Sequence, residues 1–323
     1  MKNSVRVPRF FSRSRLNLAR KIIKKMESGN LKWLRPWKYP GLRMPFNPIS
    51  KTRYSGVNVA YLLMEAEESG YADPRWITYV QAQKKGLRVK SGARGTKIEY
   101  WSEHLLKIKH GTQMTPIENA DAEDVLEENC CATPKKYCCR VYTVFNGTQV
   151  EGLPPWNVDV ERREVFSNNG RCEKIINGCG VPINYGTPGA SYSFDMSNPK
   201  NECIRMPKRE WFKDESHFYA TVLHEIAHST GNPLRMNRDM NHPAGTREYA
   251  LEELRAEFAS AFVLMDMCLA LDDEGMEEHI KQHAAYLKHW RKIANESAYE
   301  FASAIQDARE IADVVLSYEV MGL

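Results

Sequence analysis

Two histidines four residues apart, the first followed by a glutamate, are the residues best suited to chemistry: His224-Glu225-Ile226-Ala227-His228. On a helix this spacing puts both rings on one face, where they can bind one cation. Glu225 can accept a proton from a water whose pKa zinc has lowered to about 7. The pattern predicts a metallopeptidase-type site with one Zn²⁺ per chain. The plainer alternative is two helix-surface histidines beside an unrelated glutamate.

A catalytic zinc needs a third protein ligand. A third histidine, as in the pattern HExxHxxGxxH, is excluded because Leu234 occupies its position, although Gly231 fits. We therefore predict Glu253, on a following helix, as the ligand. Glu257 lies one turn later and is expected to hydrogen-bond a metal-bound histidine. Glu252 is the alternative ligand, and the weaker candidates in the intervening loop are Asp239 and His242.

Peptide hydrolysis also needs a donor to the developing oxyanion. We assign this catalytic role to Tyr249, which precedes Glu253 by one helical turn. Tyr192 and His217 stay open as alternatives.

The elements that position these residues are predicted from periodicity and capping residues. Ser216 is expected to cap a helix that reaches His228 and stops at Gly231. Further helices are expected at 161–177 and 247–267, with two more within 276–320. Short strands are expected at 181–185, 191–194 and 202–206.

Charge is distributed unevenly along the 323 residues. Residues 1–100 contain 22 Lys and Arg against 6 Asp and Glu, whereas the remainder contains 23 against 35. This asymmetry indicates two functional units, of which the basic one faces a polyanion. The basic start also resembles a transit peptide, but basic residues continue well beyond it, which favours nucleic-acid binding.

Other compositional features narrow the class of protein. No apolar run is long enough to cross a membrane. The eight cysteines come without a secretory signal, so we expect free thiols and a cytoplasmic location.

The basic unit is expected to contain helices at 14–28, 57–69 and 76–84, a hairpin at 88–101 and a strand at 140–145. An acidic insertion is expected at about 103–140, and its cysteine pairs, 130–131 and 138–139, do not have zinc-ribbon spacing. Gly152-Leu153-Pro154-Pro155 marks a boundary, which gives domains 1–155 and 156–323.

Aromatic residues alternate with Lys and Arg through the basic unit. This mixture suits single-stranded DNA, because cations follow the backbone and rings stack on bases. For any single Trp, a place in the core is the better expectation. The candidate DNA-binding residues are Arg53, Tyr54, Asn58, Trp76, Tyr79, Lys90, Arg94, Lys97 and Trp101.

Several motifs together resemble the ArdC-type antirestriction proteins of plasmids and phages. They occur in the family's order and cover most of the chain. They are Asn47-Pro48, Tyr54-Ser55-Gly56-Val57-Asn58, Trp76-Ile77-Thr78-Tyr79, Gln81-Ala82, Gly86, Val89-Lys90, Gly92, Gly95, Tyr100-Trp101, Phe145-Asn146, Gln149, Glu151-Gly152-Leu153-Pro154, His224 to Gly231, Tyr249-Ala250, Glu252-Glu253-Leu254 and Ala256-Glu257.

The resemblance implies an α+β protein of two domains. A small basic α/β domain would bind single-stranded DNA without strong sequence preference. A mainly helical, zincin-like domain of the gluzincin type, with a small antiparallel sheet, would follow. Family members are linked to protecting incoming plasmid DNA from restriction, and relatives are fused to plasmid primases. The insertion and the basic extension before Ser14 depart from the family pattern.

Three functional hypotheses follow. The first is a plasmid- or phage-type antirestriction protein that binds single-stranded DNA and carries a zinc metalloendopeptidase site for an unidentified protein substrate. The second is a DNA-protecting binding protein whose zinc site is structural or not catalytic. The third is a cellular peptidase with a basic targeting segment, which predicts negligible affinity for single-stranded DNA.

Overall fold

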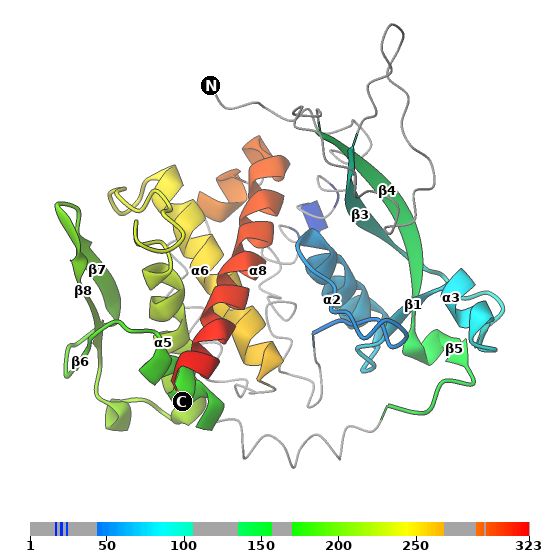
Figure 1. Cartoon of the computed structure of the whole chain (residues 1–323), viewed down its shortest axis with the longest axis horizontal. Coiled ribbons are helices and arrows are strands. Elements are labelled where there is room, and N and C mark those ends of the chain that lie inside the picture. Colours follow the sequence, from blue (N-terminus) through cyan, green and yellow to red (C-terminus); the bar gives the residue numbers. More distant parts are fainter. Residues whose placement is uncertain are drawn as a thin grey trace, which may run out of the picture.

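The computed structural model describes residues 44–105, 135–156, 170–267, 289–293 and 295–322, together with residues 17, 20, 21 and 24. For 101–105 and 135–140 only the backbone is described. Of the predicted helix 14–28, residues 17, 20, 21 and 24 are described, and they are helical. The rest of that helix, the first nine residues of the predicted helix 161–177, the centre of the insertion and much of 276–297 lie outside the described residues. The architecture is α+β, as expected (Figure 1).

A three-stranded antiparallel sheet forms the core of the basic unit. Its order is β1 (Trp76–Thr78), β4 (Lys135–Asn146), β3 (Thr96–Leu105). Because β3 and β4 pair from Thr96↔Val144 to Leu105↔Lys135, both ends of the expected insertion 103–140 belong to this ladder. The insertion was therefore drawn too wide, and its centre, 106–134, is not described.

The predicted hairpin at 88–101 is wrong, because β2 (Arg88–Val89) pairs with β5 (Val150–Glu151) and not with β3. Gln149 determines this arrangement. It ends the 3₁₀ turn η3 (Gly147–Gln149) and its carbonyl accepts from the Lys90 N–H at 2.9 Å. Its side chain donates to the Arg94 carbonyl, also at 2.9 Å. A residue more than fifty positions away thus binds the loop between β2 and β3 at Lys90 and at Arg94.

Helix α2 (Val57–Ser69) confirms the prediction at both ends, and Gly70 ends it in the left-handed conformation that favours glycine. The predicted helix 76–84 is wrong in its first three residues, which form β1. Thr78 and Gln81 make a reciprocal capping box, so α3 (Tyr79–Lys84) begins only after Thr78.

The second unit combines three long helices with a small sheet. The helices are α5 (Glu215–Ser229), α6 (Arg247–Asp266) and α8 (Ala298–Met321), and residues 170–178 are also helical. The strands are β6 (Ile183–Tyr185), β7 (Ser191–Asp195) and β8 (Asn198–Met206), followed by a 3₁₀ turn, η4 (Arg209–Trp211). Strand β8 pairs antiparallel with β7 but parallel with β6, so the sheet is mixed and not purely antiparallel.

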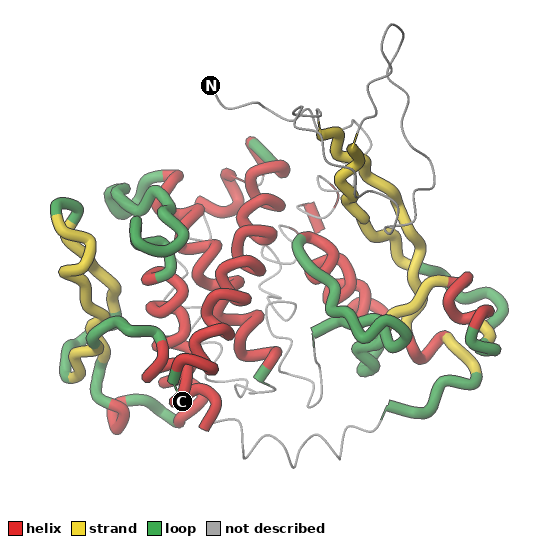
Figure 2. The backbone as a smooth tube through the Cα atoms, viewed as in Figure 1, coloured by secondary structure: helices red, strands yellow, loops and turns green. Residues whose placement is uncertain are grey.

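The two units share one hydrophobic core. Val59, Leu63 and Met64 of α2 belong to the same buried cluster as residues of α5, α6 and α8. Figure 1 shows α2 between the β1-β4-β3 sheet and α8, with the β6-β8-β7 sheet on the far side of the helices; Figure 2 shows the same elements by type. Among the described helices, none is long and apolar enough to cross a membrane.

Candidate metal centre

Helix α5 presents the two histidines from a buried position. Its N-cap is Asp214, whose carboxylate accepts from the His217 N–H at 3.0 Å, and not the expected Ser216. The helix therefore begins at Glu215, earlier than a cap at Ser216 would allow, because Asp214 has the extended backbone and the side-chain acceptor of an N-cap residue. Val222, Leu223, Ile226 and Ala227 are fully buried, so the apolar positions of α5 anchor it in the core. These contacts fix the direction of His224 and His228.

Glu253 of α6 meets both imidazoles. The Nε2 atoms of His224 and His228 are 3.0 Å apart, and each lies 3.6 Å from a carboxylate oxygen of Glu253. Donors around a tetrahedral zinc with bonds of about 2.0–2.1 Å are separated by about 3.3 Å. The three residues are buried and offer atoms that all lie within 4.8 Å of one another. Their spacing and chemistry therefore fit a divalent metal ion.

Electrostatics around the cluster favours positive charge. Burial alone would lower the pKa of His224, but Glu253, Glu257 and the charge of Glu225 hold it well above its usual value. Burial alone would likewise raise the pKa of Glu253, yet hydrogen bonding and charge from the histidines lower it to about 2. The Tyr249 hydroxyl also donates to Glu253 and lowers its pKa further. A cation at this point is stabilised by the surrounding carboxylates.

Each imidazole has a second carboxylate on its other nitrogen. A carboxylate oxygen of Glu257 lies 3.5 Å from Nδ1 of His224, so Glu257 lies beside the histidine that it was expected to contact. Glu252 lies 3.3 Å from Nδ1 of His228, on the side away from the three-residue cluster. Glu252, the alternative ligand, is only 5% exposed and is not part of the three-residue cluster.

Arg238 is a residue that sequence reasoning missed. It donates to both oxygens of Glu252, at 2.6 and 3.1 Å, and to the carbonyl of Ala227 at 2.9 Å. A Cβ on Gly231 would come within 3.0 Å of the Arg238 guanidinium and 2.4 Å of the Met240 sulfur. Gly231 therefore lets the loop return across the end of α5. An arginine in an irregular loop gives no periodic signal that would have revealed this role.

The other candidates near the centre are placed as follows. Glu225 is 6% exposed and adjoins the first histidine in sequence. The Tyr192 hydroxyl donates to Glu202 at 2.6 Å, and His217 pairs with Asp214 at 2.7 Å. The weaker ligand candidates His242 and Asp239 lie next to each other, with 3.3 Å between Nε2 and a carboxylate oxygen, and are not part of the cluster.

The predicted DNA-binding residues differ in their surroundings. Lys90, Arg94 and Lys97 are exposed, as is Tyr79. Trp76 is only 1% exposed and packs with Leu62, Ile98 and Val144, so its assignment as a stacking residue is corrected to a core role. The side chain of Trp101 lies outside the described part of the chain.

Three further candidates make contacts with other parts of the protein. The Tyr54 hydroxyl donates to the Trp76 carbonyl, and burial raises the pKa of Tyr54 to about 12. The Asn58 amide pairs with the backbone of Glu99, and Arg53 forms an ion pair with Asp266 of α6. These contacts assign structural work to all three residues.

Two exposed aromatic rings were not among the candidates. Tyr100 and Tyr142, on neighbouring strands, are 54% and 38% exposed and pack edge to face with ring centres 5.8 Å apart. Alternation along 96–100 could have indicated that the Tyr100 ring projects from one face of a strand. The partner Tyr142 could not be found without the strand register.

Comparison with protein families divides the chain in two. Residues 13–145 match the N-terminal domain of anti-restriction factor ArdC. Residues 170–307 match the zincin-like metallopeptidases.

Three relatives match nearly the whole chain. Two DNA primases TraC from Escherichia coli are 36% and 33% identical, each over 94% of this chain. The chain spans only 27% and 20% of the length of those primases. The uncharacterised protein y4eC of Sinorhizobium fredii is 30% identical over 90% of this chain and 88% of its own length.

Two solved structures share the fold. The metal-free ArdC antirestriction protein from plasmid R388 superposes with a TM-score of 0.69 at 23% identity, covering 95% of this chain and 97% of that one. Its Mn(II)-bound structure gives a TM-score of 0.67 at 24% identity, covering 94% and 97%. The predicted resemblance is confirmed: this chain belongs to the ArdC-type antirestriction family, with an ArdC-type N-terminal domain and a zincin-like metallopeptidase domain.

Proposed function

We propose that this protein binds single-stranded DNA during the entry of mobile DNA, protects that DNA from restriction, and carries a zinc-dependent peptidase site. The observation that carries the proposal is the buried cluster of His224, His228 and Glu253 beside Glu225. The proposed domain boundary lies near residue 155, and the proposed location is the cytoplasm.

The DNA-binding part of the proposal rests on charge and family. The N-terminal domain matches that of an anti-restriction factor, and the first hundred residues are strongly basic. Lys90, Arg94 and Lys97 are exposed, and Tyr79 stands on the first turn of α3 nearby in sequence. Cations together with exposed rings are the means by which proteins follow a single strand without reading its sequence.

The proposed chemistry assigns one role to each residue. His224, His228 and Glu253 would hold zinc, with Glu257 orienting His224. Bound zinc supplies Lewis acidity and lowers the pKa of a water to about 7. Glu225 would take the proton from that water and later deliver it to the leaving amine. Tyr249 is the proposed donor to the oxyanion, because it lies one helical turn before the proposed ligand Glu253 on α6.

One observation favours the second hypothesis, a DNA-protecting protein whose zinc site does no catalysis. The Tyr249 hydroxyl donates to Glu253, so the proposed oxyanion donor is engaged by a proposed ligand. A tyrosine that donates to Glu253 orients this proposed metal ligand and stabilises the site, whether or not a substrate enters.

The substitution Glu225→Gln separates the two hypotheses. It should leave zinc content and single-stranded-DNA affinity unchanged, because Glu225 is neither a proposed ligand nor a DNA contact. If peptidase chemistry is the mechanism, the variant should lose protection of unmodified plasmid DNA entering a restricting host. Glu215→Gln, at the exposed start of the same helix, is the matched control.

Metal analysis and DNA binding test the proposal directly. Purified protein should contain close to one zinc per chain and bind single-stranded DNA with an affinity that falls steeply with salt. Zinc far below one per chain would refute the metal site. Negligible binding of single-stranded DNA at moderate salt would favour the cellular-peptidase hypothesis.

A further inference from the structure

One stretch of the basic unit contains cations and no acids. Between Asp73 and Glu99, residues 74–98 contain seven Lys and Arg and no Asp or Glu. Arg75, the first of the seven, is buried and bound to Asp73. The other six are exposed: Lys84, Lys85, Arg88, Lys90, Arg94 and Lys97. The first three of these come in addition to the cations that the sequence proposed for DNA contact.

The packing of α3 and β2 turns these cations outward. Leu87 and Val89 are half-buried in a small core that includes Ala82 of α3, whereas Arg88 and Lys90 are exposed. Successive residues of an extended chain point to opposite sides, so the inward aliphatic residues force the cations toward solvent. Ala82 buries the inner side of α3 in the same way, and the end of that helix stays exposed.

Hydrogen bonds give the loop after β2 a fixed shape. Gln149 binds the backbone of Lys90 and of Arg94, and the Lys90 ammonium donates to the Thr148 carbonyl at 2.8 Å. An ammonium has three donors, so two remain for other acceptors. A surface that is ordered before it binds loses less conformational freedom on binding. Helix α3, strand β2 and residues 90–94 together form this surface, the α3–β2 surface.

Two exposed apolar side chains adjoin the cations. Tyr79 and Val80, on the first turn of α3, are 55% and 57% exposed. Val80 and Lys84 are four residues apart on the helix, so they lie on one face. Proteins that bind single strands combine rings that stack on bases with cations that follow the phosphates. Because the bases of a duplex are stacked on each other, this combination favours a single strand.

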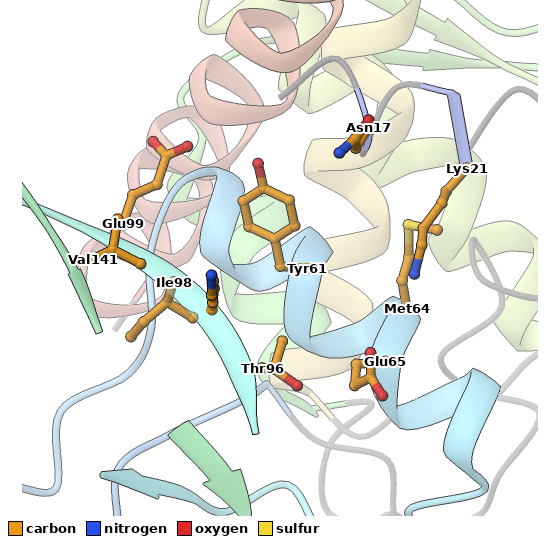
Figure 3. Close-up of a pocket in the computed structure, with 10 residues that line it drawn as sticks. Asn17, Lys21, Tyr61, Met64, Glu65, Thr96, Ile98, Glu99 and Val141 are labelled. Atoms are coloured by element: carbon orange, nitrogen blue, oxygen red, sulfur yellow. The ribbon is translucent and has the colours of Figure 1, made fainter. Parts of the chain in front are cut away.

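The cavity between α2 and β3 is less suited to a polyanion (Figure 3). It measures about 180 Å³, and its lining includes Lys21 and Lys97 but also Glu65 and Glu99. Lys21 also forms an ion pair with Glu68 at 2.9 Å. Acids and cations are therefore balanced at the cavity. The α3–β2 surface has an excess of cations.

We propose that single-stranded DNA follows the α3–β2 surface. Lys84, Lys85 and Arg88 contact its phosphates, and Tyr79 stacks on a base with Val80 beside it. Glu151 is opposite Arg88 in the β2–β5 ladder, so one acid borders the surface and the cations still outnumber it. Figure 1 shows α3 and β5 on the far side of the basic unit from α8, so a strand reaches them without crossing the helical unit. This inference rests on the proposed binding of single-stranded DNA.

Neutralising three cations tests the phosphate contacts. The full chain carrying Lys84→Gln, Lys85→Gln and Arg88→Gln is titrated against fluorescent oligo(dT) by anisotropy at a series of salt concentrations. The slope of log affinity against log salt should become shallower by about 2, since each contact to a single strand contributes about 0.7. The affinity in about 0.1 M salt should fall at least tenfold.

A second triple variant with the same change of charge is the control. It carries substitutions at exposed cations of the helical unit, Lys200→Gln, Arg205→Gln and Lys208→Gln. It should keep the slope and the affinity of the unsubstituted protein. All six positions are exposed, so thermal unfolding should be nearly unchanged in both variants. Equal losses in the two variants would reduce the effect to net charge and would overturn the assignment, as would an unchanged slope in the first.

Substitution of the exposed ring tests the stacking. Tyr79→Ala should weaken binding of oligo(dT) about 5- to 100-fold, the range for one stacked base, whereas Tyr79→Phe should keep it. Tyr100→Ala removes another exposed ring of the basic unit, on β3, and should leave the affinity unchanged. A loss with Tyr100→Ala but not with Tyr79→Ala would place the strand on the β1-β4-β3 sheet and overturn the proposal.

Failure of the surface and failure of the proposed function give different results. If the unsubstituted protein does not bind oligo(dT) even at low salt, the proposed function is refuted. If it binds, and the binding survives both the α3–β2 triple variant and Tyr79→Ala, only the α3–β2 surface is overturned. Single-stranded-DNA binding then belongs to another part of the protein.

Discussion

Each histidine of the cluster lies between two carboxylates. His228 has Glu253 on Nε2 and Glu252 on Nδ1, and Arg238 holds Glu252 in place. Burial alone would raise the pKa of Glu252, but hydrogen bonds from His228 and Arg238 lower it to about 2. An ionised Glu252 fixes the tautomer and orientation of His228.

We expect Glu252→Gln to weaken metal binding by about 10- to 100-fold, the usual effect of removing such a partner. Competition with a chromophoric chelator measures this, and Glu248→Gln, exposed on the same helix, is the control. Complete loss of metal would instead make Glu252 a ligand. Unchanged affinity would remove its positioning role.

Close backbone contact defines the junction between the helical segment 170–178 and α8. A Cβ on Gly178 would lie 2.0 Å from the carbonyl oxygen of Tyr318, so only glycine permits this approach. Beside it, the Arg171 guanidinium binds both oxygens of Glu319, at 2.7 and 2.8 Å. The junction therefore combines a close backbone approach at Gly178 with a bidentate ion pair between Arg171 and Glu319.

The ion pair predicts a pH dependence of stability at this junction. The hydrogen bond from Arg171 lowers the folded-state pKa of Glu319 below its usual value of 4.5. The stability that this ion pair contributes is therefore complete above pH 4.5. It is lost as the pH falls through the lowered folded-state pKa of Glu319. Glu319→Gln should lower the free energy of unfolding by about 1 kcal/mol or less at neutral pH.

The difference between Glu319→Gln and the unsubstituted protein should vanish in acid. Urea titrations with chelator present, at a series of pH values, measure it without interference from metal loss. A difference that stays constant through the acid range would contradict this account. Glu151→Gln, at an exposed acid on β5, provides the comparison.

At the scale of the whole molecule, the basic unit is tied to the helical unit by charge as well as by the shared core. Asp266, at the end of α6, is buried between Arg53 of the basic unit and Arg309 of α8. Burial raises the pKa of Asp266, and the two arginines oppose this effect. Arg53, whose side chain is 54% exposed, therefore has a buried partner in α6.

Two substitutions test this tie. Asp266→Asn should destabilise the protein by less than the about 3–5 kcal/mol of a fully broken buried ion pair, because Arg309 loses Asp266 but keeps its second partner, Asp313. Arg53→Gln should cost about 1 kcal/mol or less, since Arg53 is largely exposed. The affinity of the Arg53→Gln variant for single-stranded DNA should be unchanged. A marked loss of affinity would restore Arg53 to the DNA-binding surface, and thermal melts together with anisotropy distinguish these outcomes.

The sequence by itself determined what depends on near neighbours. The four-residue histidine spacing, helix α2 with its terminal Gly70, and the excess of basic residues in the first hundred all follow from local pattern. Helical periodicity also placed Glu253 and Glu257 on one helix. Such features are encoded within a few turns of chain, so periodicity and capping residues are sufficient to predict them.

Tertiary structure decided which distant residues meet. It placed Glu252 and Arg238 behind His228, buried Trp76, and paired β2 with β5 instead of β3. It also joined α2 to the core of the helical unit. Each outcome depends on partners far along the chain, where packing and hydrogen-bond satisfaction, and not local propensity, select the arrangement.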